Sequence, residues 1–391
     1  MTARRAMYTA GIVAEFDPFH KGHEYLLRQA RERGATHIAV VMSGAAVQRG
    51  EIAVCSKHER AEAALWCGAD LVAELPAPYS CSMAEYFAEA AVRILGQLSI
   101  NALCFGSEID NADNIINAAR AMDELSDSSA VRSLLAQGMS YPAAVHAAAA
   151  EKFGGETAAA LGTPNSTLGV EYVRALMKNN IAADILPVKR IGAGHDKRGG
   201  DYPSGSELRE RLLLGGDISD GVPVSCTPRV VYDPARAGEL LLFPLLTAAR
   251  EELVTLPEIN EAIADRIIKV RRDPPDSFAE FLTAVKTANI THARLRRSAL
   301  HLLLGVKKSD LSAPPFVRVL AFNRRGAEIL RRAKADVPVS ASLKELENSS
   351  MQAAHIIGIE NKAVRLQQLC RVTDGSKRFE NEYTRKIVIK K

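Results

Sequence analysis

Two histidines near the N-terminus have the side chains and the spacing to act on a phosphate group. His20 and His23 follow a short apolar run at residues 12–14, with Gly22 between them. Residues three apart on the first turn of a helix face the same way. An imidazole N–H can donate a hydrogen bond to an oxyanion as negative charge develops on it. The pair therefore predicts a site that holds phosphate oxygens, although histidines after a strand can also serve as helix caps or surface residues.

The surrounding sequence predicts the elements that position these histidines. The apolar run is typical of a buried first strand, and Pro18 requires that strand to end at about Phe16 or Asp17. A helical pattern begins at Glu24. A strand, a tight loop and a helix N-terminus form an anion site, because free backbone N–H groups and the helix dipole point at the ligand. Gly22 allows the backbone to approach that ligand closely.

The rest of the first half alternates between strands and helices. Further strands are predicted at residues 37–42, 71–75, 102–105 and 185–188, with helices at 57–67, 83–95, 111–136, 141–152 and 168–178. This order predicts an α/β fold with a doubly wound parallel sheet. Ligands bind such sheets at the carboxyl ends of the strands, where the residues around Asp17, Gly106 and Arg190 would meet.

Several polar residues near these strand ends could either contact a ligand or have an ordinary structural role. Asn165 begins a helix after a proline, so it is either a ligand contact or a simple helix cap. Arg190 ends a predicted strand and can pair with phosphates, or it can be an ordinary solvated charge. The loop at residues 48–57 is either a substrate entrance or a surface loop. Ser206 and Arg209 match a phosphate-contacting Ser-x-x-Arg element only loosely.

The chain changes character at about residue 226. The predicted elements become mainly helical, at residues 236–252, 257–270, 276–287, 291–304, 315–333 and 359–371. Residues 251–391 hold 26 Lys and Arg against 17 Asp and Glu, while the first 250 residues hold 24 against 29. A basic C-terminal third predicts a domain that binds a polyanion, with solvated helix faces as the alternative. We therefore expect domains at residues 1–225 and 226–391.

Composition narrows the class of protein. The 391 residues are 47% hydrophobic and 25% charged, as in soluble globular proteins. No signal peptide is evident, and no run approaches the ~20 apolar residues of a membrane helix. Six scattered cysteines without a CxxC pair predict reduced thiols in a cytoplasmic protein and argue against structural zinc.

Longer motifs point to a family. His20-Lys21-Gly22-His23 resembles the HxGH signature of the nucleotidylyltransferase superfamily. The series GIVAEFDPFHKGHEYLL, VMSG, QRGEIAVCSK, DLVAELP, LCFGSE, MSYPAA, TPNSTLGVEYV and PFVRVLAFNRRG resembles, in order, the bacterial tRNA(Met) cytidine acetate ligase family. The resemblance covers most of the chain and is far more specific than HxGH alone.

The resemblance implies an activity and a set of site residues. ATP, with Mg²⁺, would adenylate acetate and release pyrophosphate, and the acetyl group would pass to the wobble cytidine of elongator tRNA(Met). His20 and His23 would be catalytic. The residues expected to bind ATP are Val13, Ala14, Glu15, Phe16, Asp17, Pro18, Phe19, His20, Lys21, Gly22, His23, Glu24, Tyr25, Leu26, Gly106, Asn165 and Arg190. The arginines expected to contact tRNA are Arg294, Arg297, Arg318, Arg324 and Arg325.

Two departures from the family motif keep alternatives open. Asp17 and Lys21 stand where relatives usually carry asparagines, and Asp17 would repel a triphosphate unless Mg²⁺ or Lys21 compensates. The alternatives are another nucleotidylyltransferase that makes a nucleotide cofactor, and a non-catalytic RNA-binding protein with a degenerate nucleotide fold. Acetate-dependent use of ATP separates the ligase from both.

Overall fold

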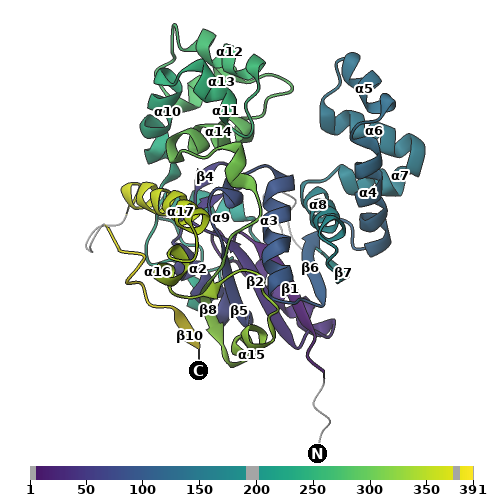
Figure 1. Cartoon of the computed structure of the whole chain (residues 1–391), viewed down its shortest axis with the longest axis vertical. Helices are drawn as coiled ribbons and strands as arrows, with labels where there is room; N and C mark the ends of the chain where they lie inside the picture. The colour runs from purple at the N-terminus through teal and green to yellow at the C-terminus, as the bar shows by residue number, and fades with distance from the viewer. Residues whose placement is uncertain (1–5, 191–201, 373–378, 391) are drawn as a thin grey trace, which may run out of the picture.

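A computed structural model describes residues 6–190, 202–372 and 379–390 (Figure 1). Its centre is a sheet with strand order β10-β8-β5-β2-β1-β6-β7, in which β9 also pairs with β8. The strands are β1 (Thr9–Ala14), β2 (His37–Ser43), β5 (Leu71–Leu75), β6 (Ala102–Ser107), β7 (Asp184–Lys189), β8 (Val317–Asn323), β9 (Val339–Ser340) and β10 (Val388–Lys390). A separate short hairpin pairs β3 (Ala46–Val47) with β4 (Glu51–Ile52).

Strands β5, β2, β1, β6 and β7 are parallel, which confirms the doubly wound sheet. The strand order reverses between β1 and β6, so the carboxyl ends of these two strands form the switch point where such sheets bind ligands. The four later strands predicted in the first half are also confirmed. Each begins and ends within two residues of its predicted limits.

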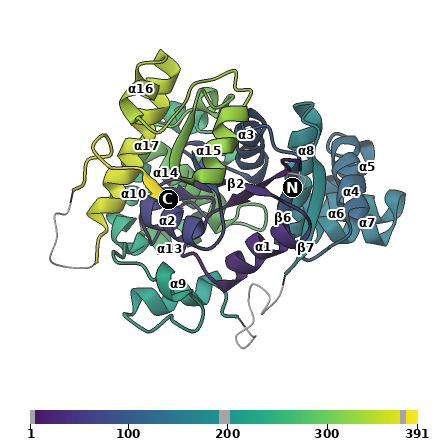
Figure 2. The same ribbon diagram turned by 90° about the horizontal axis from the view of Figure 1, so that it is seen from below.

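Helices cover both faces of the sheet because its strands are apolar on both sides. Ile12 and Val40 pack with α1 (Lys21–Glu32) and α2 (Lys57–Trp66) on one face. Val13 and Val41 pack with α3 (Ala84–Gln97) and α8 (Pro164–Lys178) on the other. Figure 2 shows these helices on opposite sides of the strands. Buried parallel strands of this kind read as continuous apolar runs.

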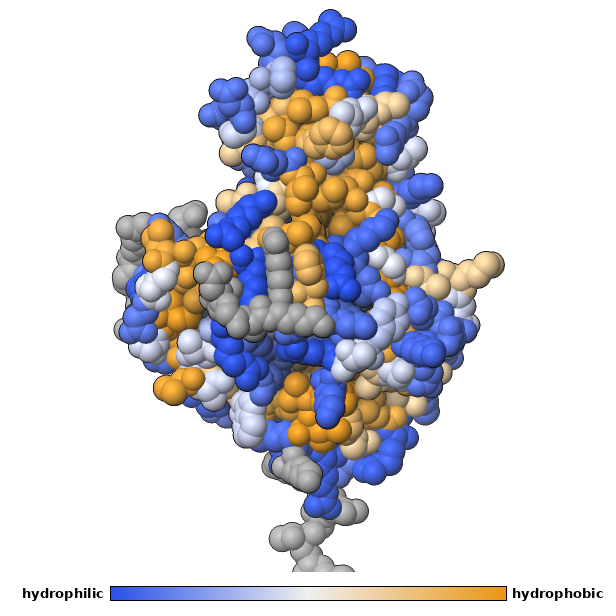
Figure 3. Space-filling view, turned by 90° about the vertical axis from the view of Figure 1, so that its left-hand side faces the viewer, coloured by the Kyte–Doolittle hydropathy of each residue, from blue (hydrophilic) through white to orange (hydrophobic). Residues whose placement is uncertain are grey.

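Two groups of helices extend from the sheet (Figure 1). One is α4 (Ala112–Leu125), α5 (Ser129–Ala136), α6 (Tyr141–Phe153) and α7 (Gly155–Leu161), between β6 and β7 in sequence. The other, which we call the helical lobe, is α10 (Gly238–Thr247), α11 (Arg250–Thr255), α12 (Glu261–Val270), α13 (Phe278–Val285) and α14 (His292–Leu304). Figure 3 shows apolar side chains on this lobe, where α10 exposes Leu240 and Phe243. None of the helices in the described ranges has both the length and the apolar character of a membrane span.

The C-terminal segment returns to the sheet, and this corrects one prediction. The helix predicted at residues 315–333 is wrong over its first half, because Val317–Asn323 forms β8, antiparallel to β5. Only α15 (Arg324–Arg332) is helical there, followed by α16 (Leu343–Glu347) and α17 (Met351–Leu369). The helix predicted at residues 236–252 is also divided, into α10 and α11. The segment after residue 226 is thus mainly helical but supplies the edge of the sheet.

A buried ion cluster fastens this segment in place. Lys57 Nζ lies 2.5 Å from Glu74, 2.9 Å from Glu360 and 3.1 Å from Glu382. Arg318 lies 3.0 Å from both Glu74 and Glu382 and is only 3% exposed. Burial and the neighbouring Glu74 raise the pKa of Glu360 to about 7, against the attraction of Lys57. Arg318, expected to contact tRNA, is therefore a structural residue, and that expectation is wrong.

Candidate active site

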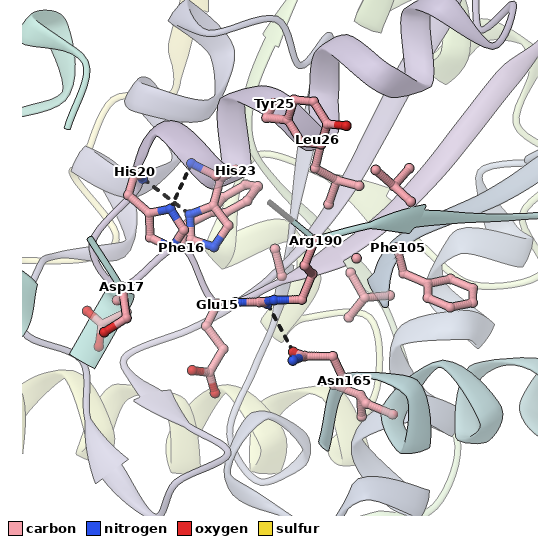
Figure 4. Close-up of a pocket in the computed structure, with 18 of the residues that line it drawn as sticks. Glu15, Phe16, Asp17, His20, His23, Tyr25, Leu26, Phe105, Asn165 and Arg190 are labelled. Carbon is pink, nitrogen blue, oxygen red and sulfur yellow. Dashed lines mark hydrogen bonds between the residues drawn. The ribbon is translucent and has the colours of Figure 1, made fainter. Parts of the chain in front are cut away.

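The predicted histidines meet at the N-terminus of α1. His20 is the helix N-cap, and its Nδ1 accepts a hydrogen bond from the backbone N–H of Gly22 at 3.0 Å. His23 Nδ1 accepts from the backbone N–H of His20 at 3.2 Å. The rings stack with centroids 3.6 Å apart, as Figure 4 shows. Because both Nδ1 atoms accept, each neutral ring carries its proton on Nε2 and can donate from there.

The surroundings keep both rings neutral. Burial, followed by the positive charges of Arg190 and Arg209, lowers the pKa of His20 to about 3. Burial and the adjacent His20 also hold the pKa of His23 well below its ordinary value. At neutral pH the two imidazoles are therefore uncharged hydrogen-bond donors. The positive charge at the site comes from arginines and helix ends instead.

Three helix N-termini face one pocket of about 310 Å³, which is within the size range of small-molecule sites. Besides α1, these are α8 and α9 (Gly205–Leu213), whose N-cap is Ser204. Arg209 of α9 donates to the carbonyl oxygen of Asp17 at 2.8 Å and to Ser206 Oγ at 3.0 Å. Helix N-termini and guanidinium groups both favour anions, so this end of the pocket suits a polyphosphate.

Arg49 compensates the negative charge of Asp17, which would otherwise repel a triphosphate. Its guanidinium lies 2.8 Å from Asp17 Oδ2 and 2.6 Å from Glu15 Oε2. The other oxygen of Asp17 accepts the Val54 N–H at 2.9 Å. Asp17 is thus buried and paired with a guanidinium of this chain, so Arg49 rather than Lys21 compensates its charge. Lys21 Nζ donates to the carbonyl oxygen of Asp220 at 2.6 Å, and Lys21 does not line the pocket, so the structure does not bring it together with the other expected ATP-binding residues.

On the far side of the pocket, an acid–amide–arginine series joins β6, α8 and the end of β7. Glu108 accepts a hydrogen bond from Asn165 Nδ2 at 2.5 Å. Asn165 Oδ1 accepts from Arg190 Nη1 at 3.1 Å, and Figure 4 shows this second bond. Burial opposes ionisation of Glu108, but bonds from Asn165 and Ser166 lower its pKa to about 2. Asn165 lies inside the first turn of α8, whose N-cap is Thr163, so Asn165 is not the cap.

The remaining wall of the pocket is apolar. Phe105 and Tyr172 pack edge to face with ring centroids 5.8 Å apart, and Leu26 and Leu168 lie nearby in the lining. Gly169 makes room for this arrangement, since a Cβ there would lie 2.3 Å from the Phe105 ring. An apolar wall beside an anion-binding end fits a ligand with a flat ring at one end and phosphates at the other.

The structure brings most of the predicted ATP residues together. The pocket is lined by Val13, Ala14, Glu15, Phe16, Asp17, His20, Gly22, His23, Tyr25, Leu26, Gly106, Asn165 and Arg190. Pro18, Phe19, Lys21 and Glu24 do not line it; Pro18 and Phe19 border a smaller cavity behind the loop. The lining residues outside the expected ATP-binding set are Gln48, Arg49, Phe87, Phe105, Leu168, Tyr172, Val188, Lys189, Tyr202, Pro203, Ser204, Gly205, Ser206 and Arg209. The sequence had offered Gln48 and Arg49 as part of a substrate-entrance loop. The loose Ser-x-x-Arg spacing was a signal for Ser206 and Arg209, whereas the apolar residues carry no such signal.

The predicted tRNA-contacting arginines occupy different places. Arg297 lies 2.6 Å from Glu258, and its Nη1 also donates to the carbonyl oxygen of Gln48 at 3.2 Å. Arg294 donates to the backbone carbonyl of Glu258 at 2.8 Å. The bond from Arg297 to Gln48 places α14 beside the loop at residues 48–57, which we call the pocket loop. Gly50 permits this approach, with φ of 78° and a virtual Cβ only 2.4 Å from the Arg297 nitrogen.

The other two arginines, Arg324 and Arg325, are exposed at the end of the sheet opposite to the pocket. Arg324 and Arg325 begin α15, directly after β8. Because β8 is antiparallel to β5, its end lies beside Asp70, at the amino end of the parallel strands. Neither side chain is therefore near the pocket at the carboxyl ends.

Comparison with known proteins places these features in a family context. A profile described as HIGH Nucleotidyl Transferase matches residues 7–382. The tRNA(Met) cytidine acetate ligase of Syntrophotalea carbinolica is 36% identical over 84% of this chain and 83% of that protein. The ligase of Listeria welshimeri is 32% identical over 91% of this chain and 96% of its own length. The crystal structure of Thermotoga maritima TmcAL bound with alpha-thio ATP aligns with a TM-score of 0.83 at 27% identity, covering 93% of this chain and 94% of that one.

Proposed function

This chain belongs to the HIGH nucleotidyl transferase family and, within it, to the tRNA(Met) cytidine acetate ligases, and we propose that it acetylates a cytidine of tRNA(Met) with acetate and ATP. One observation carries the proposal. Two neutral imidazoles present Nε2–H donors at the N-terminus of α1, next to Arg190 and Arg209, at the switch point of the sheet. This arrangement suits charge that develops on a phosphate.

In the first step, an acetate oxygen forms a bond to the α-phosphorus of ATP, and the bond from that phosphorus to the pyrophosphate oxygen breaks. Acetate is ionised near neutral pH, so the step needs no general base. We assign His20 and His23 as donors to the phosphate oxygens, and Arg190 and Arg209 as contacts for the leaving pyrophosphate. The apolar wall with Phe105 would hold the adenine. Catalysis then consists of positioning and electrostatic stabilisation.

Mg²⁺ would enter with the nucleotide and be held by its phosphates. The nearby carboxylates of Glu15 and Asp17 are already paired with Arg49. Within the described residues, no group of three His, Cys, Asp or Glu side chains is placed to bind a metal ion. The described part of the pocket therefore offers no built site for a resident metal, and its own donors are the histidines and arginines.

In the second step, the exocyclic amine of the cytosine attacks the acetyl carbonyl, the carbonyl–oxygen bond to AMP breaks, and AMP leaves with the bonding electrons. The proton that the amine loses passes to the departing phosphate or to water. The target base has to leave the anticodon stack to reach an acetyl group held inside this pocket. We propose that the wobble cytidine of elongator tRNA(Met) is this base, that residues 1–225 carry the catalysis, and that the basic residues 226–391 help hold the tRNA. The contact between α14 and the pocket loop supports this division of labour. Because the proposed substrate is a tRNA, we also propose that the protein acts in the cytoplasm.

The test is transfer of radiolabelled acetate to unmodified elongator tRNA(Met), with ATP and without it. Label in acid-precipitable tRNA that requires ATP would support the proposal. Initiator tRNA(Met) serves as the control acceptor. Intact ATP binding with no label in tRNA would contradict the proposal and favour another acyl acceptor or a cofactor-forming nucleotidyl transfer.

A further inference from the structure

Glu108 lies behind the pocket wall and touches no expected substrate. One carboxylate oxygen accepts from Asn165 Nδ2 at 2.5 Å. The other accepts from both the backbone N–H and the hydroxyl of Ser166, each at 2.9 Å. Ser166 is fully buried, and its hydroxyl also meets Ser107 Oγ at 2.9 Å. These contacts of the carboxylate all come from the first turn of α8, and Glu108 itself does not line the pocket.

These contacts determine which way the Asn165 amide points. An asparagine side chain has a donor end and an acceptor end of nearly equal size, and it can bind in either orientation. A carboxylate can only accept, so Glu108 requires the NH₂ group of Asn165 to face it. The amide oxygen must then face the opposite way, where Arg190 Nη1 donates to it at 3.1 Å.

We propose that Glu108 is a positioning residue, which orients the Asn165 amide so that its oxygen holds the Arg190 guanidinium toward the phosphates of ATP. This inference rests on the proposed function, because it takes ATP as the ligand. Arg190 is otherwise exposed at the end of β7, and a free arginine side chain loses considerable rotamer freedom when it binds a phosphate. Holding it beforehand lowers that entropic cost.

The substitution Glu108→Gln tests the orientation with little change in shape. The backbone N–H of Ser166 keeps the oxygen of the introduced glutamine on its side, so the new NH₂ group faces Asn165. The Asn165 amide must then turn over, and its own NH₂ group meets the guanidinium of Arg190, donor against donor. We expect ATP to bind about tenfold more weakly, from the loss of a hydrogen bond to a charged group.

The change in charge alone predicts the opposite effect of Glu108→Gln on ATP affinity. Removing a carboxylate near a triphosphate should tighten ATP binding, because one source of repulsion disappears. A double-mutant cycle with Arg190→Ala sharpens the contrast. If Glu108 acts through Arg190, Glu108→Gln should weaken ATP binding no further once Arg190 is replaced.

Calorimetric titration of the full-length protein with a non-hydrolysable ATP analogue measures these affinities, with thermal melting recorded in parallel. Glu156→Gln is the matched control, since Glu156 accepts from Asn114 Nδ2 at 3.2 Å at an exposed place outside the pocket. Unchanged or tighter binding by Glu108→Gln would overturn the inference. Additive weakening in the Glu108→Gln, Arg190→Ala double variant would also overturn it. If Glu108→Gln unfolds, Glu108→Asp replaces it in the cycle, and the same two outcomes apply. Wild-type protein that binds no ATP would overturn the proposed function and the inference with it.

Discussion

His20 has two tasks, which a pair of substitutions can separate. Its Nδ1 caps α1 by accepting the N–H of Gly22, and its Nε2 carries the proton that we assign to a phosphate oxygen. Serine is also a good N-cap, but its hydroxyl is too short to reach the position of Nε2. Alanine lacks both groups. His20→Ser therefore removes the donor and keeps the cap, whereas His20→Ala removes both.

The two effects have different sizes and appear in different measurements. Loss of one preorganised donor to a developing oxyanion costs about 3–4 kcal/mol of transition-state stabilisation, or roughly 10²–10³ in kcat. Loss of the N-cap costs about 1 kcal/mol of folding free energy, or roughly 2–4 °C in Tm for a domain of this size. We expect both variants to lose activity equally and His20→Ala to melt at a lower temperature than His20→Ser.

Acetate-dependent release of pyrophosphate from ATP measures the first effect, and calorimetric melting measures the second. The reasoning about the site is refuted if His20→Ser keeps the wild-type kcat. The reasoning about the cap is refuted if the serine and alanine variants melt at the same temperature. A raised KM with an unchanged kcat would mean that His20 binds the ground state and the transition state equally well.

Three further predictions concern packing, the ion cluster and pH. Gly169→Ala should displace Phe105, destabilise the fold by about 1–3 kcal/mol in urea unfolding and weaken ATP binding; Gly358→Ala, with open space around its Cβ position, is the control and should leave both unchanged or slightly improve stability. Lys57→Met should cost about 3–5 kcal/mol in the same assay by leaving buried carboxylates unpaired, and a loss below about 1 kcal/mol would contradict the role of the cluster. Burial lowers the pKa of His301 to about 3 in the folded protein. Below about pH 6.5 the unfolded chain therefore binds a proton at this residue that the folded protein does not bind. From His301 alone, the free energy of unfolding should be about 2 kcal/mol lower at pH 5 than at pH 7. Denaturant titrations at the two pH values should show that difference reduced in His301→Met.

The sequence predicted the first half of the fold well because local signals and the global fold agree there. The apolar runs at β1, β2 and β5 are buried on both faces, which makes them continuous and easy to recognise. The two histidines were found because strand, loop and helix start lie within about fifteen residues of one another. Pro18 and Gly22 marked the loop directly.

Long-range pairing explains what the sequence did not show. Strand β8 contains Arg318, which is tolerated in the core only because Glu74 and Glu382 face it, and these partners lie 244 and 64 residues away. The neutralisation of Asp17 by Arg49 is a similar case, across 32 residues. Lys21 lies within the motif, but the contact of its side chain with the Asp220 carbonyl depends on a segment 199 residues later. No local pattern encodes such partners.

The return of β8 to the sheet has a consequence for synthesis on the ribosome. Strand β5 is complete at Leu75, but its outer neighbour begins only at Val317, far later in the chain. At about 5–20 residues per second, the edge of β5 waits for roughly 10–50 s before β8 can cover it. During this interval an apolar edge strand is open to pairing with other chains, and Glu74 lacks its guanidinium partner. The nascent chain is therefore prone to aggregation for a prolonged time, and we expect chaperones to bind it before β8 pairs with β5.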